Sequence, residues 1–184
     1  MSQVLLQNAD TVITMAGDDL VGADVLIDGG VIKALGVGLD APEAKVVDAR
    51  GTVVTPGLVN THHHLYQTLT KAVPGGQDAL LFGWLQTLYP IWARMGPEHI
   101  RISTQIGLAE LALSGATCVA DHLYMFPNGA RLDDEIIAAQ DTGVRLHATR
   151  RDKRMKVFLQ RMDNAGVDIT RSALTHQDLF GAQM

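Results

Sequence analysis

The chain has 184 residues, of which 47% are hydrophobic and 19% charged, so it can bury a sizeable core and is too apolar to remain disordered. Its formal net charge of −5 argues against nucleic acid as a partner, because a phosphate backbone does not attract a negative chain. No segment has the ~20 apolar residues of a membrane span, and the N-terminus lacks the pattern of a signal peptide. We therefore expect a cytoplasmic protein that does not bind membranes.

Residues 1–56 consist of short apolar or alternating runs that are interrupted by Gly, Asp and Asn. These runs predict strands at 4–6, 11–15, 23–27, 31–35, 45–47 and 52–55. Asp28, Gly29 and Gly30 separate two of the runs and predict a tight hairpin, because glycine tolerates the positive φ of such a turn. We expect residues 1–56 to form a small antiparallel sheet.

The pattern changes after Pro56 and Gly57 to longer alternating elements. It predicts strands at 58–61, 117–120 and 144–148, helices at 97–113 and 133–140, and further long segments at 65–72 and 79–89. Pro97 suits the first turn of a helix, and Gly115 lies just past its end. Strands that alternate with helices form parallel sheets with helical crossovers, so residues 57–150 predict a parallel α/β unit.

Three consecutive histidines follow the strand predicted at 58–61. Residues two apart on a strand point to the same face, so His62 and His64 should project together and His63 should point the other way. Two imidazoles on one face can share a divalent cation, with each nitrogen about 2.0–2.1 Å from zinc. Histidines of a polar loop that only form hydrogen bonds are the alternative, and the strand directly before the pair argues against it. We predict a metal site with His62 and His64 as ligands.

Residues 54–67, Val-Thr-Pro-Gly-Leu-Val-Asn-Thr-His-His-His-Leu-Tyr-Gln, resemble the first barrel strand of the amidohydrolase superfamily. Further segments at 81–86, 88–90, 120–124 and 144–150 are similar to its deaminase and chlorohydrolase branch, which acts on aminated heterocycles. Within that branch they look most like 8-oxoguanine and isoxanthopterin deaminases, and the s-triazine hydrolases also belong to it. The resemblance covers residues 1 to about 150.

The resemblance implies a composite β-sandwich around a (β/α)8 TIM-like barrel, with residues 1–56 in the sandwich and residues 57–150 forming part of the barrel. It also implies one divalent ion, zinc or alternatively iron, which His62, His64, a third histidine and an aspartate would hold. Such an ion lowers the pKa of its bound water, and the resulting hydroxide attacks a ring carbon that bears an amino group. In the family a glutamate and a further histidine move the protons.

Four further residues are candidates for contacts with a substrate. Gln67 follows His64 by three residues and would reach a polar substrate edge, although a solvated residue at the start of a helix fits the pattern equally well. His122 and His147 lie at or near predicted strand ends, where they either line the pocket or form structural hydrogen bonds. Arg150, just past the third predicted barrel strand, is a candidate for binding a carbonyl or ring nitrogen of the substrate.

The family pattern stops after residue 150, and residues 151–184 form an unrecognised tail. Apolar residues between positions 155 and 162 have the spacing of one helix face, beside basic residues more typical of a solvated face than of a docking surface. Residues 57–184 amount to about half of the roughly 250 residues of a complete barrel. The other metal ligands and the proton-moving residues therefore have no match, and no predicted strand supports His176 or Asp178 as substitutes.

The sequence thus predicts an α/β metal-dependent hydrolase of C–N bonds whose substrate is a small aminated purine, pterin or triazine-like heterocycle. One alternative is a catalytically inactive fragment of such an enzyme, from a truncated or frame-disrupted gene or from a deletion. A second is a protein that binds metal through residues 62–64 without chemistry. A homo-oligomer is compatible with the sequence, and the catalytic acid and base stay unassigned.

Overall fold

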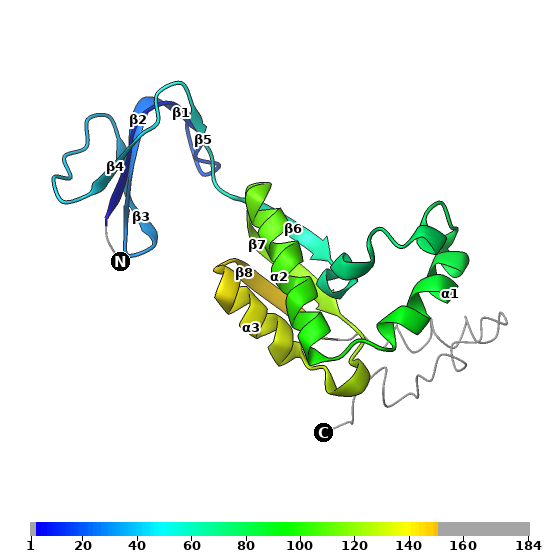
Figure 1. Ribbon diagram of the computed structural model, residues 1–184. Helices are drawn as coiled ribbons and strands as arrows, with labels where there is room; N and C mark the ends of the chain where they lie inside the picture. Colours follow the sequence, from blue (N-terminus) through cyan, green and yellow to red (C-terminus); the bar gives the residue numbers. More distant parts are fainter. Residues whose placement is uncertain (1–2, 151–184) are drawn as a thin grey trace. The chain divides into compact units, whose positions relative to one another are not determined.

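The computed structural model describes residues 3–150, and the chain divides into two compact units after Gly57. Figure 1 shows the first unit as a sheet and the second as a mixture of strands and helices. The helix predicted in the tail, His176 and Asp178 lie outside the described residues. Between residues 3 and 150, no helix combines the length and apolar character needed to cross a membrane.

The first unit is a five-stranded sheet of mixed direction. Its strands are β1 (Val4–Val12), β2 (Leu20–Asp28), β3 (Val31–Gly36), β4 (Lys45–Asp48) and β5 (Val53–Val54). β1 pairs antiparallel with β2, as predicted, but it pairs parallel with both β4 and β5. The expectation of an antiparallel sheet is therefore wrong for these two strands, because the chain crosses from β3 at one edge to the far side of β1 instead of turning back in a hairpin.

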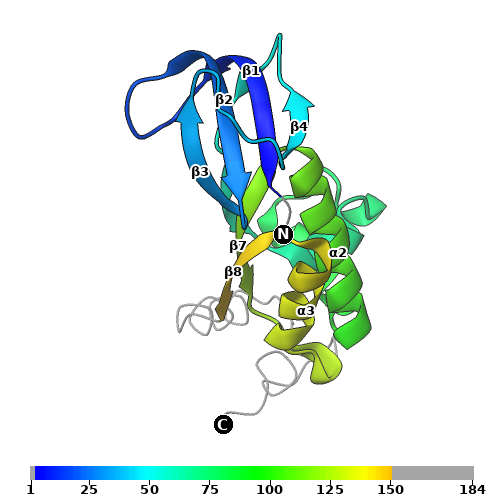
Figure 2. The same cartoon turned by 90° about the vertical axis from the view of Figure 1, so that its left-hand side faces the viewer.

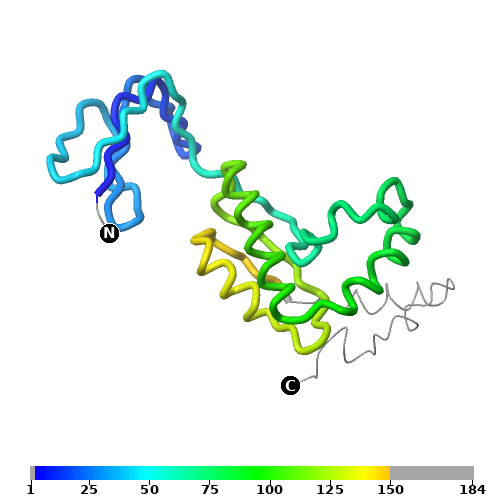
Figure 3. Tube along the Cα trace, in the orientation of Figure 1, coloured from blue at the N-terminus to red at the C-terminus, as the bar shows by residue number. Residues whose placement is uncertain are grey.

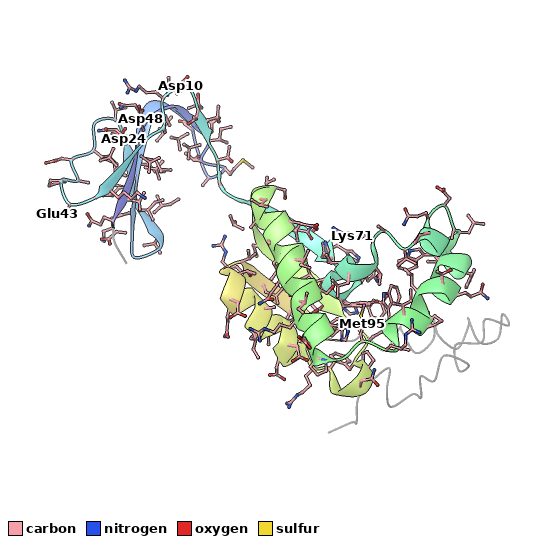
Figure 4. All side chains as sticks on the ribbon, in the orientation of Figure 1. Asp10, Asp24, Glu43, Asp48, Lys71 and Met95 are labelled. Carbon is pink, nitrogen blue, oxygen red and sulfur yellow. The ribbon has the colours of Figure 1, made fainter. Side chains whose placement is uncertain are left out.

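The strand predicted at 4–6 and the start of the strand predicted at 11–15 belong to one strand with a bulge, which ends at Val12. Asn8 has a φ of 63°, and the register of β1 against β2 shifts between Leu6 and Ala9. The bulge is held by Asp24, which Figure 4 labels: its side chain is 1% exposed and accepts the N–H groups of Asn8 at 2.7 Å and Leu39 at 2.9 Å. Both oxygens of this buried carboxylate are thus satisfied within the first unit.

The second unit contains a parallel three-stranded sheet, which confirms the prediction for this region. Its strands are β6 (Leu58–His63), β7 (Ala116–Leu123) and β8 (Arg145–Arg150), in that order. The crossover helices α2 (Pro97–Leu113) and α3 (Leu132–Thr142) cover one face of it (Figures 1 and 2). α2 has the predicted bounds, and α3 ends before Gly143, whose φ of 74° gives a left-handed cap.

A long excursion of the chain joins β6 to α2 (Figure 3). It contains the short helices η1 (Leu65–Thr70) and η2 (Pro74–Gly76) and the helix α1 (Leu81–Trp92); η3 (Pro127–Gly129) lies later, between β7 and α3. Tyr66 and Trp92 are fully buried, and their rings pack edge to face at 5.3 Å. Trp92 Nε1 also donates to Thr70 Oγ1 at 3.0 Å. This core fixes η1 directly after the three histidines.

Candidate metal and substrate site

His62 and His64 lie together at the carboxyl end of β6, where the sequence places a metal site. Their ring centroids are 4.9 Å apart, and the rings are nearly perpendicular at 86°. His63 pairs in register with Asp121 of β7, whose side chain is buried on the helix-covered face, so His63 belongs to that face. The alternation follows from the two-residue period of a strand. The assignment of His62 and His64 as metal ligands stays a prediction.

A hydrogen bond fixes the tautomer of His64. Its Nδ1 lies 2.9 Å from the carbonyl oxygen of His122. A carbonyl oxygen only accepts, so Nδ1 carries the proton and Nε2 keeps the lone pair that a metal requires. Burial lowers the pKa of His64, against an opposing effect of this hydrogen bond. His64 is therefore neutral at pH 7, which is the form that binds metal.

A second hydrogen-bond chain fixes the tautomer of His122. Thr149 Oγ1 donates its only proton to the carbonyl oxygen of Asp121 at 2.9 Å. It must therefore accept from His122 Nδ1, which lies 2.8 Å away, so His122 Nε2 is left as an acceptor. The rings of His122 and His64 are 6.0 Å apart. Thr149 was not predicted; its position two residues after His147 on the same strand was the available signal.

Gln67 is half-buried and hydrogen-bonded, so it is not a solvated residue at the start of a helix. Its Nε2 donates to the hydroxyls of Tyr66 at 2.9 Å and Tyr124 at 3.2 Å. Burial raises the pKa of both phenols, which keeps them protonated at neutral pH. The Tyr124 ring lies 5.1 Å from that of His64, so Gln67 is tied to the histidine pair through a residue that sequence reasoning missed.

His147 and Arg150 are less closely connected to this cluster. His147 is exposed and pairs in register with Ala120, and between residues 3 and 150 it makes no hydrogen bond or ring contact with the site. Arg150 is the last residue of β8 and pairs with Leu123. The prediction that Arg150 follows the strand is thus wrong, because β8 runs two residues further than its apolar run 144–148 indicates.

The described residues bring together two imidazoles that we expect to be part of a metal site. His62 and His64 are paired imidazoles with a suitable neutral nitrogen on His64, which fits two positions of a zinc coordination shell. In the part of the chain that the structure describes, no group of three His, Cys, Asp or Glu side chains is arranged to hold a metal. A tetrahedral zinc site needs two further ligands, from protein or water.

Comparisons with known proteins agree with the sequence resemblance. Residues 53–172 match the amidohydrolase family, and the match extends past residue 150 into a segment where the sequence alone showed no family pattern. Over 154 residues the chain is 44% identical to an 8-oxoguanine deaminase of Pseudomonas aeruginosa, covering 82% of this chain and 34% of that protein. Over 144 residues it is 39% identical to an isoxanthopterin deaminase of an unknown prokaryotic organism, covering 74% and 30%.

The structure is also similar to solved structures of a chlorohydrolase and a deaminase. An atrazine chlorohydrolase of Arthrobacter aurescens TC1 complexed with zinc matches with a TM-score of 0.72 and 34% identity, covering 80% of this chain and 35% of that one. An adenosine deaminase of Xanthomonas campestris with bound zinc matches with a TM-score of 0.60 and 29% identity, covering 78% and 32%. The chain spans about a third of the length of these relatives. By the family match over residues 53–172, the chain belongs to the amidohydrolase family.

Proposed function

We propose that the chain forms the N-terminal portion of a metal-dependent hydrolase that deaminates an aminated purine, pterin or triazine-like heterocycle. The observation that carries the proposal is the His62–His64 pair at the carboxyl end of a parallel strand, with Nε2 of His64 left for a metal. Active sites of parallel barrels collect at this end of the strands. The matches to 8-oxoguanine deaminase and isoxanthopterin deaminase support the choice of substrate class.

The proposed architecture is a composite β-sandwich around a (β/α)8 barrel. The first unit would contribute strands to the sandwich, and β6, β7 and β8 would be the first three barrel strands. The alternation along β7 supports this: Val119, Asp121 and Leu123 are buried, whereas Ala120 and His122 are half-buried. The less buried face is the one that a closed barrel turns inward.

A single zinc ion is the proposed metal, since three of the matched structures contain zinc. Bound zinc would activate a water molecule for attack on the ring carbon. Within this chain, His62 and His64 would hold the ion. Gln67, fixed by two phenols, and His122, with Nε2 as an acceptor, would orient the heterocycle. The exposed His147 and the strand-end residue Arg150 are weaker candidates for the same role.

A catalytically inactive fragment is the second candidate, and the two-ligand site favours it for this chain alone. Between residues 3 and 150 there is no group of three possible metal ligands, and no residue is assigned as the acid or base. General acid–base catalysis contributes about 10²–10⁴ in rate, so a chain without it turns over very slowly. This candidate concerns the isolated chain and is compatible with a deaminase site in a longer protein.

A chimera separates the two candidates. Residues 1–150 replace the matching part of the Pseudomonas aeruginosa 8-oxoguanine deaminase, and ammonia release is measured from 8-oxoguanine, isoxanthopterin and aminated triazines. We expect turnover by the chimera, loss of turnover in its His62→Ala variant, and retention in His99→Ala, an exposed position on α2. The zinc-loaded 184-residue chain is assayed beside it and should be inactive. A folded, zinc-loaded chimera that releases no ammonia would contradict the deaminase proposal.

A further inference from the structure

Two carboxyl side chains lie buried between the sheet and its helices, on the face opposite His122. Asp121 of β7 is 1% exposed and Glu135 of α3 is 0% exposed. Asp121 belongs to the helix-covered face, together with Val119 and Leu123. Buried carboxyls are costly unless they are paired and hydrogen-bonded, so this pair requires a structural reason.

Asp121 holds the peptide that follows the proposed metal ligand His64. Its Oδ1 accepts the backbone N–H of Leu65 at 2.5 Å, and Leu65 is the first residue of η1. The next residue of β7, His122, accepts the imidazole N–H of His64 through its carbonyl oxygen at 2.9 Å. Two consecutive residues of β7 thus hold the main chain and the ring at the same point of the histidine segment.

Glu135 is the candidate hydrogen-bond donor for the second carboxyl oxygen of Asp121. Asp121 Oδ2 and both oxygens of Glu135 are buried and make no hydrogen bond of standard geometry with the described residues. The two carboxyls interact with each other, and one proton shared between them would satisfy an oxygen of each. Burial and the facing Asp121 carboxylate raise the pKa of Glu135 to about 10, so Glu135 keeps this proton at neutral pH. Burial raises the pKa of Asp121 too, but the Leu65 N–H and Glu135 oppose it.

We propose that Asp121, held in place by the carboxylic acid of Glu135, is a positioning residue that orients His64 toward the metal. The metal part of this proposal rests on the proposed function; the part about the His64–Leu65 peptide does not. Outer partners of metal-binding histidines typically change metal affinity 10–100-fold when they are removed. Glu135 lies on α3, which covers the opposite face of the sheet from His122, and is 0% exposed, so an effect of its substitution on metal binding would be indirect.

The test uses the 184-residue chain and three variants. Glu135→Gln keeps a donor for Asp121, Glu135→Leu removes it, and Asp24→Asn changes an equally buried carboxylate of the first unit as a matched control. The amide proton shift and hydrogen exchange of Leu65, the ¹⁵N shifts that report the His64 tautomer, and zinc affinity by competition are measured for each. Circular dichroism and the amide spectrum establish that each variant is folded.

We expect Glu135→Leu to shift the Leu65 amide, to mix the His64 tautomers and to weaken zinc binding about 10–100-fold. Glu135→Gln should stay within about threefold of the parent, and Asp24→Asn should leave all three readouts unchanged while it lowers stability. The proposal is overturned if Glu135→Leu changes neither Leu65 nor zinc affinity, or if Glu135→Gln is as damaging as Glu135→Leu. Absence of zinc binding by the parent would overturn the metal role alone, because the Leu65 and His64 signals would still decide whether Asp121 positions the peptide.

Discussion

The two faces of the β6–β7–β8 sheet differ: one packs against helices, and the other carries the candidate ligand-binding residues. On the covered face, Val119, Asp121 and Leu123 are buried against α2, α3 and η1, and the Asp121 carboxyl accepts the N–H of Leu65. On the other face, His122 is half-buried and leaves a ring nitrogen as an acceptor. Substitutions on the covered face should therefore lower stability first, and substitutions on the other face should lower ligand binding first.

The largest effect expected on stability is that of Trp92→Ala. Trp92 is fully buried, packs edge to face against Tyr66 and donates to Thr70, so its removal leaves a large cavity under η1. We expect a loss of about 3–5 kcal/mol in the free energy of unfolding, measured by urea denaturation. Phe82→Ala, at a position of α1 that is 47% exposed, is the control and should cost far less. Equal losses in both variants would show that the core around η1 is not packed as described.

On the other face, His64→Ala should weaken zinc binding more than it lowers the free energy of unfolding. His64 presents Nε2 to the proposed metal, whereas His63 shares the helix-covered face with Asp121. We expect His64→Ala to weaken zinc binding by more than about 100-fold, or about 2.7 kcal/mol, and His63→Ala to weaken it less than tenfold. Isothermal titration of the purified chain checks both values. The reverse order of the two variants would refute the assignment of His62 and His64 as the metal-facing pair.

A smaller effect is expected at the contact between α2 and η1. A Cβ on Gly107 would lie 2.7 Å from Leu65 Cδ2 and 2.8 Å from Thr68 Oγ1, which is too close for either atom. Gly107→Ala should therefore destabilise the chain by about 1–3 kcal/mol. Gly83→Ala on α1 is the matched control, because its Cβ would meet only Ala79 Cβ at 3.8 Å, and it should stabilise by about 0.5–1 kcal/mol. Thermal unfolding of the two variants in opposite directions is the expected result.

Sequence reasoning worked where one local pattern decides the structure. Pro97 and Gly115 marked the ends of α2, and the period of two placed His62 beside His64. It failed where distant segments decide: the direction of β4 depends on a crossover that has no local signature. The roles of Asp121 and Thr149 were also missed, since each depends on hydrogen bonds to residues far away in sequence. The sequence signal for Asp121 was a carboxylate directly after the apolar run of the strand predicted at 117–120.

Stability should also depend on pH through Glu135. The pKa of Glu135 is about 10 in the folded chain and 4.5 for the unperturbed side chain, because of burial and the Asp121 charge. The folded state therefore binds one more proton than the unfolded state between these values. Stability from this group is complete below pH 4.5 and is lost as pH rises toward 10, by at most about 1.4 kcal/mol per pH unit.

The buried histidines give stability the opposite dependence on pH, and they do so only at acidic pH. Burial lowers the pKa of His63 and His64 from 6.5, so they remove stability only as pH falls below that value. Urea unfolding is therefore measured between pH 7 and 9, and Glu135→Gln, which cannot ionise, should flatten the decline seen in the parent. The same slope in the parent and the variant would mean that Glu135 is ionised in the folded chain. Asp121 and Glu135 would then both be negatively charged. Glu135 would repel the Asp121 carboxylate, and it could not hold Asp121 in place for its hydrogen bond with Leu65.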